Sequence, residues 1–279
     1  MFEVRSNEVL APQVHRMVVR APRVAAARQP GQFVIVRLKE GAERIPLTIA
    51  DADPQAGTIT LVIQALGHST KDIVATPVGG ALRDVAGPLG KPTEIHKWGK
   101  VVCVGGGVGT AVLFPLAKAL ADAGNEVTAL IGGRSAPYVI LKDELAAFCT
   151  HVLVTTDDGT LGVKGFVTAV LGELLADPAR RPDAVIAVGP VPMMAAISEQ
   201  TRPLGIHTLV SLNPIMVDGT GMCGGCRVTV GGQIKFACVD GPEFDGHQVD
   251  FAELAQRLKA YQEIHDRCKL ADVPAGGAA

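Results

Sequence analysis

The chain has 279 residues, of which 48% are hydrophobic and 19% charged, and its formal net charge at pH 7 is −2. This balance describes an ordinary globular protein and excludes a bulk electrostatic attraction to nucleic acid or to an anionic membrane surface. The N-terminus lacks the apolar run of a signal peptide, and no stretch of about 18 apolar residues could cross a membrane. We therefore expect a cytoplasmic protein of two compact units and a small appendage.

Residues 1–97 consist of short alternating or apolar stretches that are broken by proline and glycine. This pattern predicts an antiparallel β-barrel. Within it, residues 44–48 and 62–70 offer a guanidinium group, hydroxyl groups and a glycine-relieved backbone, which suit the phosphates and the ring of a flavin. As bare patterns, the same residues are also compatible with two barrel strands that have polar ends.

Trp98 and Gly99 mark the boundary with a second unit. Over residues 98–212, apolar runs typical of buried strands alternate with helical patterns. Such alternation predicts a doubly wound α/β domain with a parallel sheet.

A glycine-rich loop follows the first strand of this second unit. Gly105, Gly106, Gly107, Val108 and Gly109 end an apolar strand and open a helix, where backbone N–H groups can face a pyrophosphate. The loop departs from the strict G-x-G-x-x-G fingerprint, and a tight strand-to-helix turn is the alternative. Its position at the carboxyl end of the first strand favours a nucleotide site.

Three later loops also follow strands and should surround the same crevice. They contribute the candidate nucleotide contacts Arg134, Ser135, Asp157, Asp158, Gly189 and Pro190. The acidic residue that reads an adenosine ribose would lie after the second strand, where this chain has Arg134 instead. That arginine could hold a 2′-phosphate, stack on adenine or contact the pyrophosphate, so the cofactor choice stays open.

The third unit, residues 213–279, has the spacing D-x4-C-x2-C-x11-C, made by Asp218, Cys223, Cys226 and Cys238. Two cysteines three residues apart in a glycine-rich loop can reach one metal ion, and in a reducing compartment such spacing indicates a metal site. Asp218 is the nearest fourth ligand, although an Asp-Gly turn is its alternative role, and Cys268 is another candidate. Zinc competes with an iron–sulfur cluster. Residues 250–269 predict an amphipathic helix, and we expect a disordered tail after it.

Together these motifs resemble the ferredoxin–NADP⁺ reductase superfamily, in the branch that contains the electron-transfer subunit of dihydroorotate dehydrogenase. The resemblance covers nearly the whole chain. The residues that match or accompany its flavin motifs are Arg44, Pro46, Leu47, Thr48, Ile63, Gln64, Gly67, Ser69 and Thr70. The dihydroorotate branch has four cysteines in the cluster motif, whereas this chain has Asp218 in the first place. That departure resembles the small subunits of the electron-bifurcating NADH-dependent ferredoxin:NADP⁺ oxidoreductases.

The resemblance implies an oxidoreductase subunit with FAD, one [2Fe–2S] cluster with Asp218 as a ligand, and NAD(H). It also implies a heterodimer with a larger subunit that carries further flavin and [4Fe–4S] clusters, and through it an indirect exchange with ferredoxin. No side chain need act as a general acid or base, because the cofactors carry the chemistry. The alternatives are an electron-transfer subunit of dihydroorotate dehydrogenase or sulfide dehydrogenase and, outside the enzymes, a zinc-binding nucleotide-sensing module.

Overall fold

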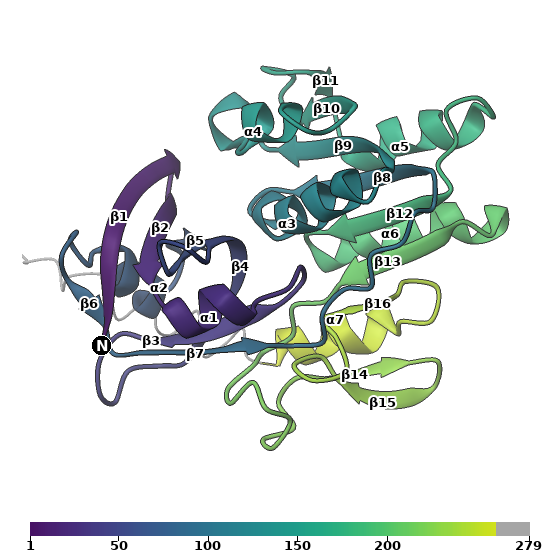
Figure 1. Ribbon diagram of the computed structural model, residues 1–279. Coiled ribbons are helices and arrows are strands. Elements are labelled where there is room, and N and C mark those ends of the chain that lie inside the picture. Colours follow the sequence, from purple (N-terminus) through teal and green to yellow (C-terminus); the bar gives the residue numbers. More distant parts are fainter. Residues whose placement is uncertain (261–279) are drawn as a thin grey trace, which may run out of the picture.

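We describe the fold from a computed structural model, in which residues 1–260 are described. Figure 1 shows three parts: an antiparallel sheet at the N-terminus, a parallel sheet flanked by helices, and a small C-terminal part beside both. Of the predicted C-terminal helix, α7 (Phe251–Lys259) is described. The rest of that prediction, Cys268 and the predicted disordered tail lie outside the described residues.

The N-terminal part is an antiparallel sheet of seven strands in the order β6-β1-β2-β5-β4-β3-β7. Alternation along its strands builds the core: in β5, Ile59, Leu61 and Ile63 are buried while their neighbours are half-buried. The predicted antiparallel barrel is confirmed. The elements are β1 (Phe2–Ala11), β2 (Val14–Arg20), α1 (Pro22–Ala27), β3 (Phe33–Arg37), β4 (Ile45–Asp53), β5 (Thr58–Gln64), α2 (His68–Val74), β6 (Ala81–Leu82) and β7 (Asp84–Leu89).

The second part is the predicted doubly wound domain, with the sheet order β11-β10-β9-β8-β12-β13-β16. The chain builds outward from β8 in one direction and then returns to place β12 on its other side. The crevice between β8 and β12 is therefore the point where α/β sheets bind ligands. The elements are β8 (Lys100–Gly106), α3 (Gly109–Asp122), β9 (Glu126–Gly133), η1 (Ala136–Tyr138), α4 (Lys142–Ala146), β10 (His151–Thr156), β11 (Val163–Lys164), α5 (Val167–Ala176), β12 (Ala184–Val188), α6 (Val191–Thr201), η2 (Arg202–Leu204) and β13 (His207–Ser211).

The seam between these two parts is held by one buried amide. Asn125 Oδ1 accepts hydrogen bonds from the backbone N–H groups of Trp98 (2.8 Å) and Gly99 (3.1 Å). Its Nδ2 donates to the carbonyl oxygens of His96 and Leu120, both at 2.9 Å. The connecting segment is therefore fixed to the end of α3 before β8 begins.

The C-terminal part consists of the hairpin β14 (Arg227–Val230) and β15 (Gln233–Phe236), the strand β16 (Glu243–Asp245) and α7. Strand β16 pairs antiparallel with β13 and so extends the nucleotide-domain sheet. The apolar residues of the C-terminal part share one core with that sheet and with Phe33 and Ile35 of the barrel. The division of the chain into three separate domains stays a prediction. The three parts share residues of one hydrophobic core.

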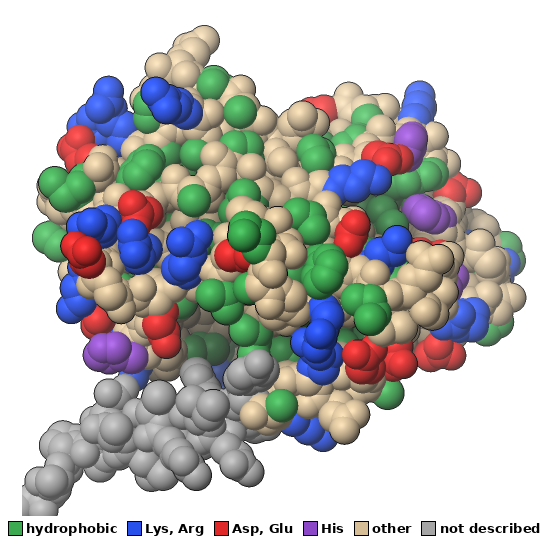
Figure 2. Space-filling model, turned by 90° about the horizontal axis from the view of Figure 1, so that it is seen from below, with side chains coloured by type: hydrophobic (Ala, Val, Ile, Leu, Met, Phe, Trp, Pro, Cys, Tyr) green, Lys and Arg blue, Asp and Glu red, His purple; other side chains and the backbone are tan. Residues whose placement is uncertain are grey.

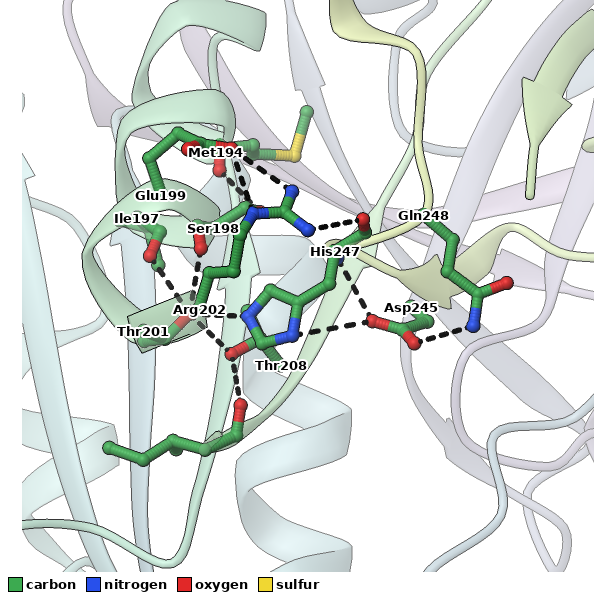
Figure 3. A network of polar contacts seen from close by, with 11 residues as sticks. Met194, Ile197, Ser198, Glu199, Thr201, Arg202, Thr208, Asp245, His247 and Gln248 are labelled. Atoms are coloured by element: carbon green, nitrogen blue, oxygen red, sulfur yellow. Dashed lines mark hydrogen bonds and ion pairs between the residues drawn. The ribbon is translucent and has the colours of Figure 1, made fainter. Parts of the chain in front are cut away.

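A polar network fastens β16 to the end of α6 (Figure 3). The ring nitrogen Nε2 of His247 lies 2.9 Å from Thr201 Oγ1, and Thr208 donates to the same hydroxyl at 2.7 Å. Arg202 donates from Nη1 to the carbonyl oxygen of His247 at 2.8 Å. Because Thr201 and Thr208 are buried, these bonds satisfy polar groups that would otherwise destabilise the fold.

The face in Figure 2 carries acidic and basic side chains interspersed with apolar ones. This surface therefore offers no extended field of one sign to attract a polyanion. Among the helices of residues 1–260, none is long and apolar enough to span a membrane.

Candidate cofactor sites

A cleft of about 1170 Å³ lies between the barrel and the nucleotide domain, and residues of both domains line it. Its size is that of a site for a large cofactor rather than for a small metabolite. From the barrel, the predicted lining residues are Pro46, Leu47, Thr48, Gln64, Gly67, Ser69 and Thr70. From the nucleotide domain, they are Gly106, Gly107, Val108, Gly109, Arg134, Asp157, Gly189 and Pro190.

On the barrel side, the cleft ends at the turn into α2. Thr70 Oγ1 lies 3.0 Å from the carbonyl oxygen of Gly67 and 3.2 Å from its backbone nitrogen, which closes this turn. Ser69 donates its hydroxyl hydrogen to the carboxylate of Glu43, which also lines the cleft. Hydroxyl groups and a glycine backbone are thus gathered where the sequence predicts the phosphates of a flavin.

On the other side, glycine is required at the strand-to-helix turn because the chain approaches itself closely. A Cβ atom at Gly109 would lie 2.5 Å from the carbonyl oxygen of Val188. Gly107 has φ +57°, and a Cβ atom there would meet nothing within 4 Å. The loop therefore needs one glycine for packing and another for its left-handed backbone, and it leaves backbone facing the cleft.

Five predicted cofactor contacts do not line the cleft: Arg44, Ile63, Gly105, Ser135 and Asp158. Ile63 is fully buried in the barrel core, because alternation in β5 turns it away from Gln64. The carboxylate of Asp158 accepts hydrogen bonds from the backbone N–H and the hydroxyl of Thr160, at 2.9 and 2.7 Å, which lower its pKa.

Arg44 contacts a different part of the chain. Its Nε donates to the carbonyl oxygen of Val217 at 2.9 Å, and its Nη2 lies 3.4 Å from that of Asp218. The arginine of the predicted flavin motif therefore contacts the cysteine-rich segment.

Sequence motifs did not predict several other residues that line the cleft, namely Phe33, Tyr138, Phe166, Ser211 and Asn213. The guanidinium of Arg134 lies 4.8 Å from the centre of the Tyr138 ring. Phe166 is 67% exposed beside the cleft. Its position between β11 and α5, on the ligand-binding side of the sheet, was the available signal, because an exposed aromatic side chain there can cover a planar ligand.

The cysteine-rich segment wraps around the Asp218 carboxylate. Its two oxygens accept hydrogen bonds from the backbone N–H groups of Thr220 (3.0 Å), Met222 (3.0 Å) and Cys223 (2.8 Å). These bonds, with Thr220 the largest contributor, lower the pKa of Asp218 to about 2. The carboxylate is therefore ionised at neutral pH, as a metal ligand must be.

The thiols lie in two environments. Cys226 and Cys238 are buried with their sulfur atoms 3.2 Å apart, whereas Cys223 is exposed and contacts Asp218. Burial, followed by the contact with Cys226, raises the pKa of Cys238 to about 12. Within residues 1–260, no three such side chains converge on one point as a closed metal site. The carboxylate and the three sulfur atoms of this segment are suited to a [2Fe–2S] cluster in the nature of their donor atoms.

Comparison with known proteins finds a matching family and similar full-length chains. The family described as the iron–sulfur cluster binding domain of dihydroorotate dehydrogenase B matches residues 213–250. A dihydroorotate dehydrogenase B (NAD⁺) electron transfer subunit homolog from Thermotoga maritima is 48% identical, over 94% of this chain and 92% of that protein. An electron transfer subunit of this dehydrogenase from Bacillus velezensis is 33% identical, over 88% and 96%.

A solved structure is similarly close. A chain from the NADH-dependent reduced ferredoxin–NADP oxidoreductase, reported in connection with flavin-based electron bifurcation, superposes with a TM-score of 0.89. Its sequence identity is 46%, and the alignment covers 97% of this chain and 98% of that one.

A barrel and a nucleotide domain that share one cleft, followed by a cluster-binding segment, define an electron-transfer oxidoreductase of the ferredoxin reductase type. The chain belongs to the family of dihydroorotate dehydrogenase B electron transfer subunits. This membership supports FAD, a [2Fe–2S] cluster and NAD(H) as its cofactors. It also confirms the expected oxidoreductase subunit and argues against the zinc-binding nucleotide-sensing alternative.

Proposed function

We propose that the chain is the small subunit of an electron-bifurcating NADH-dependent ferredoxin:NADP⁺ oxidoreductase. The observation that carries this proposal is the shared cleft, in which the predicted flavin motifs of β4 and α2 face the glycine loop of β8 and α3. The similarity over nearly the full length of the solved oxidoreductase chain supports it. The partner is then a larger subunit with further flavin and [4Fe–4S] clusters, which exchanges electrons with ferredoxin.

When bound, the nicotinamide supplies a hydride, and FAD converts the electron pair into single electrons that the [2Fe–2S] cluster can accept. The chain's own residues place these groups. Pro46, Leu47 and Thr48 would hold the flavin ring along β4, while the turn at Gly67 would receive its phosphates. The backbone of Gly106 and Gly107 would receive the pyrophosphate of NAD(H) at the start of α3.

Asp218, Cys223, Cys226 and Cys238 would hold the cluster. Their donor set fits it chemically, because three cysteine sulfur atoms and one ionised carboxylate are available in a backbone that already donates N–H groups to this region. Arg44 would keep the cluster-binding segment beside the flavin barrel through the Val217 carbonyl. We assign catalysis to the cofactors and no general acid or base to the side chains.

The test is anaerobic purification of the full chain from cells that also produce its native partner. We expect a yellow-brown protein with flavin and iron whose colour bleaches when NADH is added. The partner should contain flavin and [4Fe–4S] clusters, and the complex should reduce ferredoxin only when NADP(H) and NAD(H) are both supplied. A colourless chain would contradict the proposal.

The electron transfer subunit of a dihydroorotate dehydrogenase is the second candidate, since relatives with that name match nearly the whole chain. The presence of Asp218 where that branch has cysteine favours the first candidate. The partner decides between them: a dihydroorotate-oxidising partner without [4Fe–4S] clusters would establish the second. A partner that oxidises sulfide would instead indicate a sulfide dehydrogenase.

A further inference from the structure

A carboxyl group without an assigned role lies where the three parts of the chain meet. Glu243, on β16, accepts a hydrogen bond from Ser211 of β13 at 2.9 Å and another from Thr93 of the connecting segment at 2.8 Å. The barrel closes over the group, because a Cβ atom at Gly31 would lie 2.0 Å from Thr93 Oγ1 and 2.8 Å from Glu243 Oε2. A carboxylate in such a place loses hydration, and hydrogen bonds from these two hydroxyl groups replace part of it.

The group is connected to the cofactor cleft. Ser211 and the residue before Glu243, Pro242, both line the cleft. Ser211 has a single hydroxyl hydrogen and directs it to Glu243. While Glu243 is ionised, the Ser211 oxygen can therefore offer only lone pairs to a ligand.

Protonation of Glu243 reverses this arrangement. A carboxylic acid has one hydrogen to donate, so it can turn one neighbouring hydroxyl into an acceptor and release that hydroxyl's own hydrogen. The Ser211 hydroxyl could then donate into the cleft. A donor is the better partner for a ligand that has gained negative charge.

Among the described residues, no charged side chain contributes to the pKa of Glu243. Burial raises the pKa of Glu243 to about 7, and the bonds from Thr93 and Ser211 oppose that rise without any charged side chain among the causes. On the connecting segment, Lys91 and Glu94 pair with each other at 3.1 Å. In the barrel, Arg28 pairs with Asp51 at 3.2 Å.

On β16 itself, Asp245 is engaged by the backbone N–H of His247 and by the side chain of Gln248, both at 2.9 Å. The strand β13 contributes His207, whose ring contacts that of Trp98 in a tilted arrangement at the opposite end of the strand from Ser211. Glu243 is therefore a buried titratable group that is connected to the cleft through the Ser211 hydroxyl.

We propose that Ser211 and Glu243 form a proton-exchanging pair: Glu243 binds a proton when the cofactor in the cleft gains electrons, and Ser211 then donates its hydrogen bond into the cleft. The proton comes from water, a carboxyl O–H bond forms, and Glu243 carries no electrons, which NADH supplies. By linkage, reduction of the cofactor raises the affinity of Glu243 for its proton, and protonation eases reduction. Glu243 is thus a positioning residue that acts through Ser211, and this inference rests on the proposed function.

The test is a reduction-minus-oxidation infrared difference spectrum of the flavin-loaded full chain, with its partner, at pH 7. We expect a carboxylic C=O band to appear on reduction and to vanish in Glu243→Gln. The band should remain in the control Glu94→Gln, because Glu94 is an exposed carboxylate of the connecting segment whose pKa is lowered by Lys91. A band that persists in Glu243→Gln, or no band in the unaltered protein, would overturn the inference.

Two further variants apply even where Glu243→Gln does not fold. Thr93→Val removes one donor to the ionised form and keeps the link to the cleft, so the band should remain and its titration midpoint should move to higher pH. Ser211→Ala removes the other donor and also breaks the link, so the reduction-induced band should be lost. Equal bands in both variants would refute the role of Ser211. A chain that binds no flavin contradicts the proposed function itself, whereas bound flavin without this band contradicts only the present inference.

Discussion

Arg44 donates a hydrogen bond from its Nε to the carbonyl oxygen of Val217, 2.9 Å away, across 173 positions of the chain. Val217 immediately precedes Asp218, whose carboxylate accepts three backbone N–H groups of the cysteine-rich loop. One side chain immediately before β4 therefore restrains the loop that holds the candidate cluster ligands. Arg257 of α7 restrains the same loop from another side, because its Nη2 lies 3.4 Å from the carbonyl oxygen of Gly225.

We predict that Arg44→Gln weakens the cluster site while leaving the fold intact. An exposed hydrogen bond of this kind contributes about 1 kcal/mol to stability, so the thermal transition should move little. The electron paramagnetic resonance signal of the reduced cluster should broaden, because the loop then samples more than one arrangement. Arg83→Gln is the matched control, since Arg83 is a partly exposed barrel arginine that pairs with Glu40. An equal change of the signal in both variants would argue against a specific role of Arg44.

Asp218 is predicted to ligate the cluster through oxygen. Asp218→Cys should retain the cluster and lower its midpoint potential by on the order of 100 mV, because a thiolate donates more electron density to iron than a carboxylate. A redox titration followed by visible absorption measures this change. If spectrum and potential both stay as they were, Asp218 is a loop-forming residue and another group completes the ligand set.

The buried thiols provide a separate test of the same site. Cys226→Ser should lower the iron content of the purified chain about tenfold, because one of two adjoining sulfur ligands is lost. Cys149→Ser is the control, since Cys149 is a half-buried thiol packed in the core of the nucleotide domain. Iron analysis by mass spectrometry distinguishes the two variants, and equal iron in both would exclude Cys226 as a ligand.

The two glycines of the nucleotide loop should respond differently to alanine. Gly109→Ala drives a methyl group against the Val188 carbonyl, a Cβ to oxygen distance of 2.5 Å, and should lower the free energy of unfolding by about 3 kcal/mol. Gly107→Ala has open space and should cost about 1 kcal/mol for its left-handed backbone. Its methyl group adds to the cleft wall, so the substitution should weaken the free energy of NADH binding more than it lowers the free energy of unfolding. Urea unfolding and NADH titration measure the two effects, and the reverse order of stabilities would contradict this account.

Much of this fold could be predicted because its signals are local. Alternating strands such as β5, and the strand-to-helix turn at Gly107, can be predicted from a few consecutive residues. The gathering of Arg134, Asp157 and Gly189 beside that turn follows from the rule that carboxyl ends of parallel strands share one edge. The alternation in β5 also contained the reason why Ile63 lies in the core.

Other features depend on contacts between distant segments, which no local pattern reports. Strand β16 has three residues, and only its pairing with β13 makes it part of the sheet. The Arg44 side chain could equally face the cleft or the cysteine-rich loop until the position of Val217 is known. Glu243 becomes notable only when Thr93 and Ser211 surround it, and its sequence, Pro-Glu-Phe, resembles an ordinary turn.

The burial of the Glu243 carboxyl group also predicts how the stability of the cofactor-free chain depends on pH. The pKa of Glu243 is raised from 4.5 to about 7 by burial, so between these values the folded protein binds more protons than the unfolded one. The free energy of unfolding should therefore fall by at most about 3 kcal/mol as pH rises from about 4.5 to about 7. Above pH 7 it should stay level. Glu243→Gln cannot ionise and should lose this slope, so that it exceeds the unaltered protein in stability at pH 8. Urea unfolding at a series of pH values measures the slope, with Glu94→Gln as the control that keeps it. A slope that survives in Glu243→Gln would mean that the carboxyl group is hydrated in solution, since only its removal from water can make ionisation oppose folding.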